Sequence, residues 1–513
     1  MLRIPMLFRV NTIVFIGSFC VMVIELIAAR ILAPYIGVSL YTWTSIIGVI
    51  LMGIALGNYL GGKIADRYPS YLVLVAIFSI GGLLTILILP ALKIVTSGNW
   101  FDAMPVMWDF MLKTSCIFLL PAIVLSMVSP LVIKLTLADL GHTGGIVGTI
   151  YATSTAGAIL GTFMTGFYFI LWFGTSKIVW LVGGVLILTG IIILIFWPGG
   201  SKWRLSLRNL LIWTAIIEVM LVYLFFLQAR GNWEQTYTRE SNYFTIQVQD
   251  YRTNMKRLLL DNLVHGYVHP EQPSVLVYGY EQIFREILDY IAEDNPAPKV
   301  LHLGGGSYTF PRFIDIVFRK SVNEVVEIDP VVTEVAYDEL GLPQDTRIIT
   351  YNQDARLFLI KRKPVDKYDI VIGDVFNDKS TPYHLTTLEF DSLVKSHMKE
   401  DGVYMINIVD NYKEGRYMPS FIHTLNQVFR NVYLFSRGET EENDAYSTFV
   451  ILATDRHIEL NDYKQFITGG GTRKMVGTPY DENRLGEYLS ERDPILLIDD
   501  HVPTDILVSK LFR

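Results

Sequence analysis

The chain has 513 residues, 51% of them hydrophobic, and its mean hydropathy is +0.36, which is too apolar for one ordinary soluble enzyme. The formal net charge of −7 is mild, and no basic run alternates with aromatic residues, so the sequence excludes a nucleic-acid footprint and predicts no nucleic-acid partner. Long uncharged runs end near residue 230, and charged residues are frequent afterwards. This shift predicts a membrane domain at 1–230 and a soluble part with its own core.

The amino-terminal part is predicted to be a multi-pass α-helical membrane domain. A helix needs about 20 apolar residues to cross the hydrocarbon layer of a bilayer. The first apolar stretch is too long for a removed signal peptide and lacks a small-residue cleavage site. The sequence therefore predicts about seven spans in the cell membrane, with the lipid bilayer as a partner. These spans are 11–32, 41–62, 71–95, 113–137, 145–172, 177–197 and 209–228.

Two signals disagree about the side on which the soluble part lies. Lys63, Arg67, Lys134 and the basic residues of 202–208 fall in connections on one side, which the positive-inside tendency makes cytoplasmic. Seven spans would then place the soluble part outside. A nucleotide-type loop in that part argues the other way, because such cofactors are supplied in the cytoplasm. We expect a cytoplasmic soluble domain.

Some residues within the predicted spans are unusual for a purely apolar helix. Glu25 and Arg30 stand in the first span, where a charge costs on the order of 3 kcal/mol and usually pairs or lines a polar cavity. Glycines at near-helical spacing more often mark close-packed helix faces than binding sites. Those glycines are Gly57, Gly61, Gly62, Gly157, Gly161 and Gly166.

The soluble part is predicted to hold a small β subdomain at 231–280 and an α/β domain at 281–513. Period-two alternation at 242–251, 256–262 and 274–280 indicates short antiparallel strands. After them, helical and strand patterns alternate, which predicts a mostly parallel, doubly wound, Rossmann-like sheet. The expected strands are 299–304, 324–329, 347–354 and 368–375, with helices at 281–294, 310–320, 331–340 and 355–363.

Polar and small residues follow each of these strands, at the edge where doubly wound sheets bind ligands. Gly304, Gly305 and Gly306 follow the first strand, and they permit a tight turn that approaches a ligand closely. Glu327 ends the second strand, at the spacing of an acid that accepts hydrogen bonds from ribose hydroxyls. The combination favours a nucleotide-binding loop over a simple turn.

Two aspartates follow the next two strands. Asp354 has the position of an acceptor for an adenine amino group, although Asp is also a favoured cap for the helix that begins there. Asp374 lies at the mouth of a central strand, where it is a candidate general base. The alternative for Asp374 is a strand-end turn former.

The soluble domain resembles the spermidine synthase family of aminopropyltransferases. The matching segments are "VLHLGGGSYTFPRF", "VVEIDPVV", "NQDARLFL" and "YDIVIGDVFND". The whole chain is similar to membrane-fused members of that family, whose amino-terminal half resembles part of a major facilitator transporter. The segments that carry this second likeness are "GNYLGGKIADR", "TPYHLTTLEF" and "LIDDHVPTDIL". The resemblance implies a methyltransferase-type α/β fold and a homodimer.

The resemblance also implies roles for individual residues. It makes Asp374 and Tyr280 catalytic, with Asp374 helping to deprotonate an attacking amine. Decarboxylated S-adenosylmethionine, or S-adenosylmethionine itself, would be held by Gly304, Gly305, Gly306, Glu327, Asp354 and Ala355. The amine substrate would be bordered by Ser307, Asn377, Asp378, Tyr383 and Gln282. No metal ligand set is implied.

Several positions depart from the family pattern. Ser307 and Asn377 stand where the family carries acids, and Phe244 and His265 replace two glutamines that contact the cofactor. Two carboxylates suited to a dication are therefore missing, and the amine acceptor is not determined. Three functions stay open: aminopropyl transfer to an amine in polyamine biosynthesis, methyl transfer from S-adenosylmethionine, and a polyamine transporter or sensor regulated by the nucleotide domain.

Overall fold

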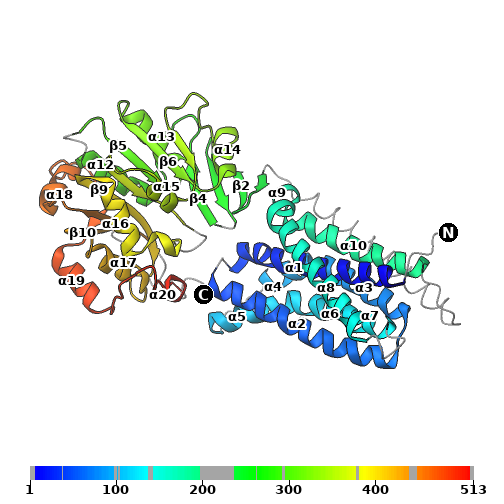
Figure 1. Ribbon diagram of the computed structural model, residues 1–513. Helices are drawn as coiled ribbons and strands as arrows, with labels where there is room; N and C mark the ends of the chain where they lie inside the picture. Colours follow the sequence, from blue (N-terminus) through cyan, green and yellow to red (C-terminus); the bar gives the residue numbers. More distant parts are fainter. Residues whose placement is uncertain are drawn as a thin grey trace. The chain divides into compact units, whose positions relative to one another are not determined.

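The computed structural model divides into two compact units, Met1–Glu234 and Gln235–Arg513 (Figure 1). We call them the amino-terminal unit and the carboxy-terminal unit, and each is considered by itself. The residues described are 6–36, 39–97, 101, 104–136, 143–196, 236–252, 254–261, 263–291, 295–376, 381–437 and 447–508.

The amino-terminal unit is helical throughout its described residues, drawn in blue to teal in Figure 1. Two of its long helices contain a π-helical turn, in which hydrogen bonds skip one residue more than in an α-helix. The helices are α1 (Met6–Ile36), α2 (Leu40–Arg67), α3 (Tyr71–Ile86), α4 (Ile88–Ser97), α5 (Val106–Thr114), η1 (Ser115–Leu119), α6 (Leu120–Ser126), α7 (Val128–Thr136), α8 (Thr143–Met164), η3 (Thr165–Phe169), α9 (Ile170–Phe173) and α10 (Thr175–Phe196).

Within the described residues, five helical stretches are long and apolar enough to cross a membrane. A sixth arises if α3 and α4, which meet at a bend of 42°, form one broken span. These six stretches overlap the first six predicted spans. The seventh predicted span, 209–228, lies outside the described residues. A strongly apolar helical unit is therefore established, whereas membrane crossing remains a prediction.

Glycines allow two helix pairs of this unit to approach closely. A Cβ atom added at Gly57 would lie 2.3 Å from the Ile123 carbonyl oxygen, and one at Gly61 would lie 2.7 Å from Met127 Cα. On α8, Gly157 and Gly161 face the backbone of α1 in the same way, with Phe15 and Phe19 oxygens 2.4 and 2.7 Å from an added Cβ. Side chains larger than hydrogen would push these backbones apart.

Two of the six predicted packing glycines do not make such contacts. A Cβ atom added at Gly62 or Gly166 meets nothing within 4 Å. The near-helical spacing therefore identified the packing faces correctly at four positions. The spacing alone did not distinguish the four packing glycines from Gly62 and Gly166, which lie on the open side of their helices.

The pair Gly61 and Gly62 gives a matched test of this packing. We expect Gly61→Ala to lower the free energy of unfolding by about 1–3 kcal/mol, because the new methyl group overlaps the Met127 backbone. Gly62→Ala should be neutral or slightly stabilising, because alanine is the better helix former by about 0.5–1 kcal/mol. Thermal unfolding of both variants in detergent measures the difference, and equal stabilities would contradict the close approach of α2 and α6.

A four-stranded antiparallel sheet opens the carboxy-terminal unit. Its strands pair in chain order and are β1 (Thr236–Glu240), β2 (Thr245–Asp250), β3 (Lys256–Leu260) and β4 (Leu263–Val268). The strand predicted at 274–280 is wrong, because this segment turns at Val275, whose N–H donates to the Gln272 carbonyl, and then enters a helix at Gly279. The apolar residues before Gly279 belong to an irregular segment whose Leu276 packs into the core, and this segment pairs with no strand of the described sheets.

The larger sheet has eight strands in the order β12-β10-β11-β9-β8-β5-β6-β7. Strands β7, β6, β5, β8 and β9 run parallel, and β11, β10 and β12 add an antiparallel edge. The strands are β5 (Lys299–Leu303), β6 (Val322–Glu327), β7 (Ile349–Asn352), β8 (Tyr368–Gly373), β9 (Met398–Asp410), β10 (Asn431–Ser436), β11 (Ser447–Thr454) and β12 (Thr478–Pro479). The predicted Rossmann-like α/β fold is thus confirmed, with a mixed sheet.

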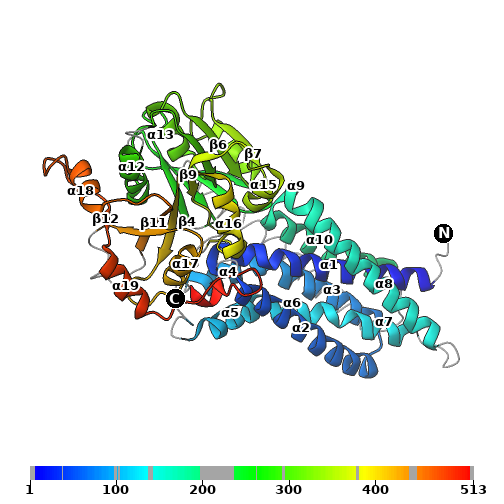
Figure 2. The same ribbon diagram turned by 60° about the vertical axis from the view of Figure 1, so that its left-hand side comes forward.

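Helices cover both faces of this sheet, because alternate residues of each buried strand point to opposite sides (Figure 2). Val300 of β5 joins a core with α12, α13 and α18, whereas Leu301 joins the opposite core with α15, α16 and α17. A third core packs α14 against the small sheet. The helices are α12 (Gly279–Ile291), α13 (Thr309–Val317), α14 (Pro330–Asp338), α15 (Ala355–Lys361), η5 (Tyr383–Leu385), α16 (Leu388–Ser396), α17 (Tyr417–Leu425), α18 (Leu460–Thr468), α19 (Glu482–Ser490) and α20 (Thr504–Leu507).

Candidate active site

The glycine loop after β5 is held by the carboxylate at the end of β6. Glu327 Oε2 accepts hydrogen bonds from the N–H groups of Gly305 and Gly306 at 2.8 and 3.1 Å, and its Oε1 accepts from Asp329 N–H at 3.0 Å. Burial raises the pKa of Glu327, and these backbone donors oppose the rise. A carboxylate offers about four acceptor positions, so Oε1 keeps one for a ligand hydroxyl.

Only glycine fits at position 304, because the residue that follows β8 lies against it. Its φ angle is +97°, which side chains rarely tolerate, and a Cβ atom there would lie 2.2 Å from the Asp374 carbonyl oxygen. Gly306 also has a positive φ, +49°, and an added Cβ would meet nothing within 4 Å. The loop therefore combines a tight contact with β8 and an open side.

Asp374 is fixed between two elements. Its Oδ2 accepts a hydrogen bond from the Tyr280 hydroxyl at 3.0 Å, and its Oδ1 accepts from Asn407 Nδ2 at 2.9 Å. Burial raises the pKa of Asp374, and these two donors oppose the rise. The pKa of Tyr280 is raised well above its usual value, first by burial and then by the Asp374 charge, so the phenol stays protonated and donates. A clamped, partly desolvated carboxylate suits proton transfer.

A cavity joins the glycine loop, Glu327 and Asp374. The small sheet contributes Tyr243, Phe244 and His265, with the rings of Phe244 and His265 centred 6.4 Å apart. The lining residues are Tyr243, Phe244, Leu260, His265, Gly304, Gly306, Val326, Glu327, Ile328, Gln353, Asp354, Ala355, Asp374, Val375, Phe376, Pro382, His384 and Leu385. The site thus lies at the carboxyl ends of β5, β6, β7 and β8, as the sequence predicted.

Asp354 caps a helix and also lines the cavity, whereas its role as an acceptor for an adenine amino group stays a prediction. Its Oδ1 caps α15 by accepting from Leu357 N–H at 2.9 Å, which confirms the helix cap. Its Oδ2 lies 3.0 Å from His384 Nε2, and this contact holds the pKa of Asp354 below its usual value. Both residues line the cavity, so Asp354 also borders any bound ligand.

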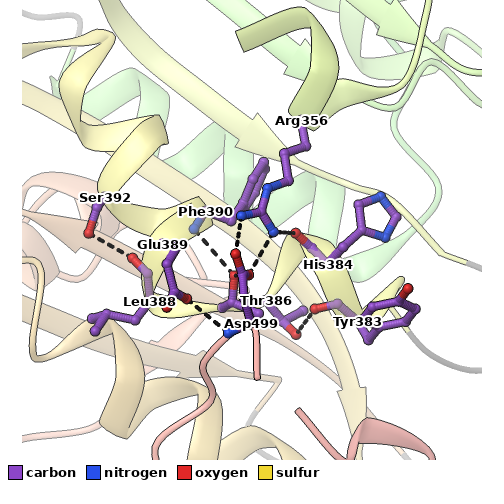
Figure 3. A network of polar contacts seen from close by, with 10 residues as sticks. Arg356, Tyr383, His384, Thr386, Leu388, Glu389, Phe390, Ser392 and Asp499 are labelled. Carbon is purple, nitrogen blue, oxygen red and sulfur yellow. Dashed lines mark hydrogen bonds and ion pairs between the residues drawn. The ribbon is translucent and has the colours of Figure 1, made fainter. Parts of the chain in front are cut away.

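The His384 segment is supported by residues far away in the sequence, shown in Figure 3. Arg356 Nη1 donates to Asp499 Oδ1 at 2.7 Å and to the His384 carbonyl at 3.1 Å, and Thr387 also donates to Asp499. Glu389 accepts from Asp499 N–H at 3.0 Å. The hydrogen bonds from Arg356 keep the pKa of Asp499 low. The "LIDDH" segment therefore braces one rim of the cavity.

The residues predicted to contact the amine are scattered. Ser307 is buried and its hydroxyl bonds Thr309 Oγ1 at 2.7 Å, while Gln282 Nε2 donates to the Leu276 carbonyl at 2.8 Å. Tyr383 is 60% exposed and begins η5. Asn377 and Asp378 lie outside the described residues. The structure thus brings together Tyr280, Asp374, Glu327 and the glycines, and it gives Ser307 and Gln282 partners within the protein.

Three residues of the site were missed by the sequence analysis. Glu281 follows Tyr280 directly and is 3% exposed. Asn407 is a polar residue in the otherwise apolar run "VYMINIV" of β9, and this interruption was a usable signal. Tyr243 precedes the predicted Phe244, and no pattern distinguished it.

Two nitrogen atoms at the cavity are suited to a nucleobase. His265 Nε2 and Gln353 Nε2 are buried, and within the described part of the chain neither has a hydrogen-bond partner. Burial lowers the pKa of His265 to about 4, so its ring is neutral at pH 7. Buried polar atoms normally find partners, so these nitrogens fit a heterocyclic ligand with polar edges.

Residues 286–441 match the family model of the spermine/spermidine synthase domain. The polyamine aminopropyltransferase of Vibrio vulnificus (strain CMCP6) is 36% identical over 126 residues, which are 23% of this chain and 40% of that protein. The polyamine aminopropyltransferase of Oceanobacillus iheyensis is 26% identical over 269 residues, 49% of this chain and 50% of the relative. The N-terminal histidine N-methyltransferase of Emericella nidulans is 34% identical over 135 residues, 25% of this chain and 24% of that protein. The chain thus spans at most about half the length of these relatives.

The brace around Asp499 can be tested by ligand affinity. We expect Asp499→Asn to weaken nucleoside binding by about two- to fivefold, because a partly exposed ion pair has a modest effect. Calorimetric titration with 5′-methylthioadenosine measures it. Asp500→Asn, at the next and exposed residue, is the matched control, and an equal affinity in both variants would show that the brace does not shape the cavity.

Proposed function

We propose that the carboxy-terminal unit transfers the aminopropyl group of decarboxylated S-adenosylmethionine to an amine, and so acts in polyamine biosynthesis. The observation that carries the proposal is Asp374, held by Tyr280 and Asn407 in the cavity that also contains the glycine loop and Glu327. The match to the spermine/spermidine synthase domain and the two aminopropyltransferase relatives support it.

The residues of the site meet the demands of this reaction. The co-substrate supplies a carbon that is electrophilic because it is bonded to a positively charged sulfur. An alkyl ammonium, with a pKa of about 10.4, must first lose a proton before its nitrogen can attack. Asp374 accepts that proton, and the nitrogen lone pair then forms the new C–N bond. The C–S bond breaks, and its electron pair stays on sulfur as a neutral thioether.

The nucleoside is assigned to the other end of the cavity. Glu327 has one acceptor position left for a ribose hydroxyl, and Asp354 borders the base. His265, which stands where the family carries a glutamine, and Gln353 each offer a buried nitrogen that has no partner among the described residues. Gly306, open on its outer side, lets the chain approach the ligand closely.

Methyl transfer from S-adenosylmethionine is the second candidate. The similarity to an N-terminal histidine N-methyltransferase, and to the mouse eEF1A lysine and N-terminal methyltransferase at 31% identity over 153 residues, favours it. Both reactions deliver a carbon from sulfur to a nucleophile in the same kind of cavity. They differ in the group transferred, so product mass distinguishes them.

We further propose that the apolar helices of the amino-terminal unit anchor the enzyme in the cell membrane, with the catalytic domain in the cytoplasm. Among the described residues, five helical stretches of sufficient length, or six if α3 and α4 form one span, support this assignment together with the cytoplasmic origin of the co-substrate. A homodimer is proposed from the family resemblance alone. Protease protection of the carboxy-terminal unit in sealed vesicles tests its side of the membrane.

The proposed role of Asp374 as general base predicts a loss of turnover without a loss of co-substrate binding. Asp374→Asn should lower kcat by about 10²–10⁴-fold, because the amide cannot accept the proton. The dissociation constant of decarboxylated S-adenosylmethionine should change little. Single-turnover mass spectrometry with putrescine measures the reaction, and calorimetry measures binding.

Parallel titration with decarboxylated and intact S-adenosylmethionine provides the comparison for the wild-type protein. Tighter binding of the decarboxylated form and an aminopropyl mass increase in the amine support the first proposal. Preference for the intact form with a methyl mass increase would replace it with methyl transfer. Undiminished turnover of Asp374→Asn would remove the general-base role.

A further inference from the structure

Two buried oxygen atoms near Asp374 accept no hydrogen bond from the described residues. They are Glu281 Oε2 and Asn407 Oδ1. Glu281 is 3% exposed and Asn407 is 6% exposed, so bulk water does not solvate them freely. An unpaired buried acceptor is costly, on the order of 1–3 kcal/mol, and its presence at a site calls for a ligand that donates.

Both atoms belong to side chains grouped around the candidate base. Asn407 donates through its Nδ2 to Asp374 Oδ1, which leaves its Oδ1 as the unused end of the amide. Glu281 lies in the first turn of α12, next to Tyr280, whose hydroxyl donates to Asp374 Oδ2. The pKa of Glu281 is raised first by burial and then by the charge of Asp374, which places the two carboxyl groups in one region. One buried region therefore holds two carboxylates and an amide oxygen.

The chemistry of these groups selects one kind of ligand. An ammonium group has three N–H donors and no acceptor, so it can satisfy several oxygen acceptors at once. Its positive charge also offsets the repulsion between two neighbouring carboxylates. The phenol rings of Tyr278 and Tyr280, centred 5.4 Å apart, add aromatic surface next to Glu281.

We propose that Glu281 and Asn407 bind the ammonium group of the amine acceptor beside Asp374, with Glu281 as the second carboxylate of the amine site. This inference rests on the proposed transferase function. Glu281 would supply the acid that the family carries at the position of Ser307. The Ser307 hydroxyl is itself engaged with Thr309. The substrate class it selects is a primary aliphatic amine.

The pH dependence of amine binding follows from the surroundings of Glu281. Burial, and then the Asp374 charge, raise the pKa of Glu281 to about 8, and a backbone hydrogen bond at Tyr278 opposes them. The other charged or titratable groups close to this turn are Tyr278, Tyr280 and Arg437, whose guanidinium packs against Gly279. As pH rises through about 8, Glu281 loses its proton and amine binding should strengthen, until the amine itself loses its proton near 10.4.

The test is calorimetric titration of the full chain with putrescine while 5′-methylthioadenosine is bound. At pH 9, where Glu281 carries its charge, we expect Glu281→Gln to weaken putrescine binding by about ten- to hundredfold, as for loss of a charged hydrogen-bond partner. The strengthening of binding between pH 7 and 9 should disappear. The affinity for 5′-methylthioadenosine should stay within about twofold, which also shows that the variant is folded.

Two further variants separate the role of Glu281 from a general effect of charge. Asp289→Asn removes a carboxylate from the same helix, where it pairs with Arg285 at the surface, and should leave putrescine binding unchanged. Glu281→Asp keeps the charge and should keep the rise in affinity with pH. The wild-type pH profile is itself informative if Glu281→Gln does not fold.

Three outcomes would overturn the proposal. In the first, wild type and Glu281→Gln bind putrescine equally well at pH 9. In the second, the wild-type affinity does not rise between pH 7 and 9. In the third, the wild-type protein binds 5′-methylthioadenosine but no putrescine. Failure of the proposed function gives a different result. In that case neither 5′-methylthioadenosine nor decarboxylated S-adenosylmethionine binds, whereas Glu281-dependent putrescine binding would still support the ammonium site.

Discussion

The chemistry of the site depends on how one half-buried carboxylate, Asp374, is held. Three elements meet there: β8 carries the aspartate, α12 supplies the Tyr280 hydroxyl, and β9 supplies the Asn407 amide. Desolvation favours the neutral acid, and the two donors favour the carboxylate. The carboxyl group is thus poorly hydrated and fixed by two donors, an arrangement that suits proton transfer.

Glu327 organises the other half of the cavity through backbone contacts. It accepts N–H groups from the glycine loop and from the start of α14, so one side chain sets the position of two segments at the cavity. The proposed role of Glu327 as a ribose acceptor would come in addition to these backbone contacts. Removing the carboxylate would release the loop as well as the ligand, so a loss of binding in such a variant would not by itself prove direct contact.

The two units obey different packing rules. In the carboxy-terminal unit, alternate strand residues fill two apolar cores, and large aromatic side chains such as Tyr308 and Phe313 are fully buried. In the amino-terminal unit, glycines bring helix backbones together, and many large apolar side chains remain exposed. Exposed apolar surface on long helices is the arrangement expected where the surrounding solvent is lipid.

The sequence determined the elements whose signal is local. The alternation of strands and helices after residue 280, the glycine loop, Glu327 and Asp374 were all predicted, because strand ends and their first residues follow one another in the chain. The capping role of Asp354 was also predicted, since a cap acts within one turn of its own helix. The strand predicted at 274–280 was wrong, because alternation alone does not show whether a partner strand exists.

Only the tertiary structure decided which side chains share the cavity. Glu281 and Asn407 are separated by more than a hundred positions in the chain, and folding places both beside Asp374. The brace from Asp499 to Arg356 joins equally distant segments. Conversely, Ser307 and Gln282 lie next to predicted site residues but are engaged by Thr309 and Leu276. The physical reason is that side-chain direction and burial depend on contacts between distant segments, which residue type and spacing do not encode.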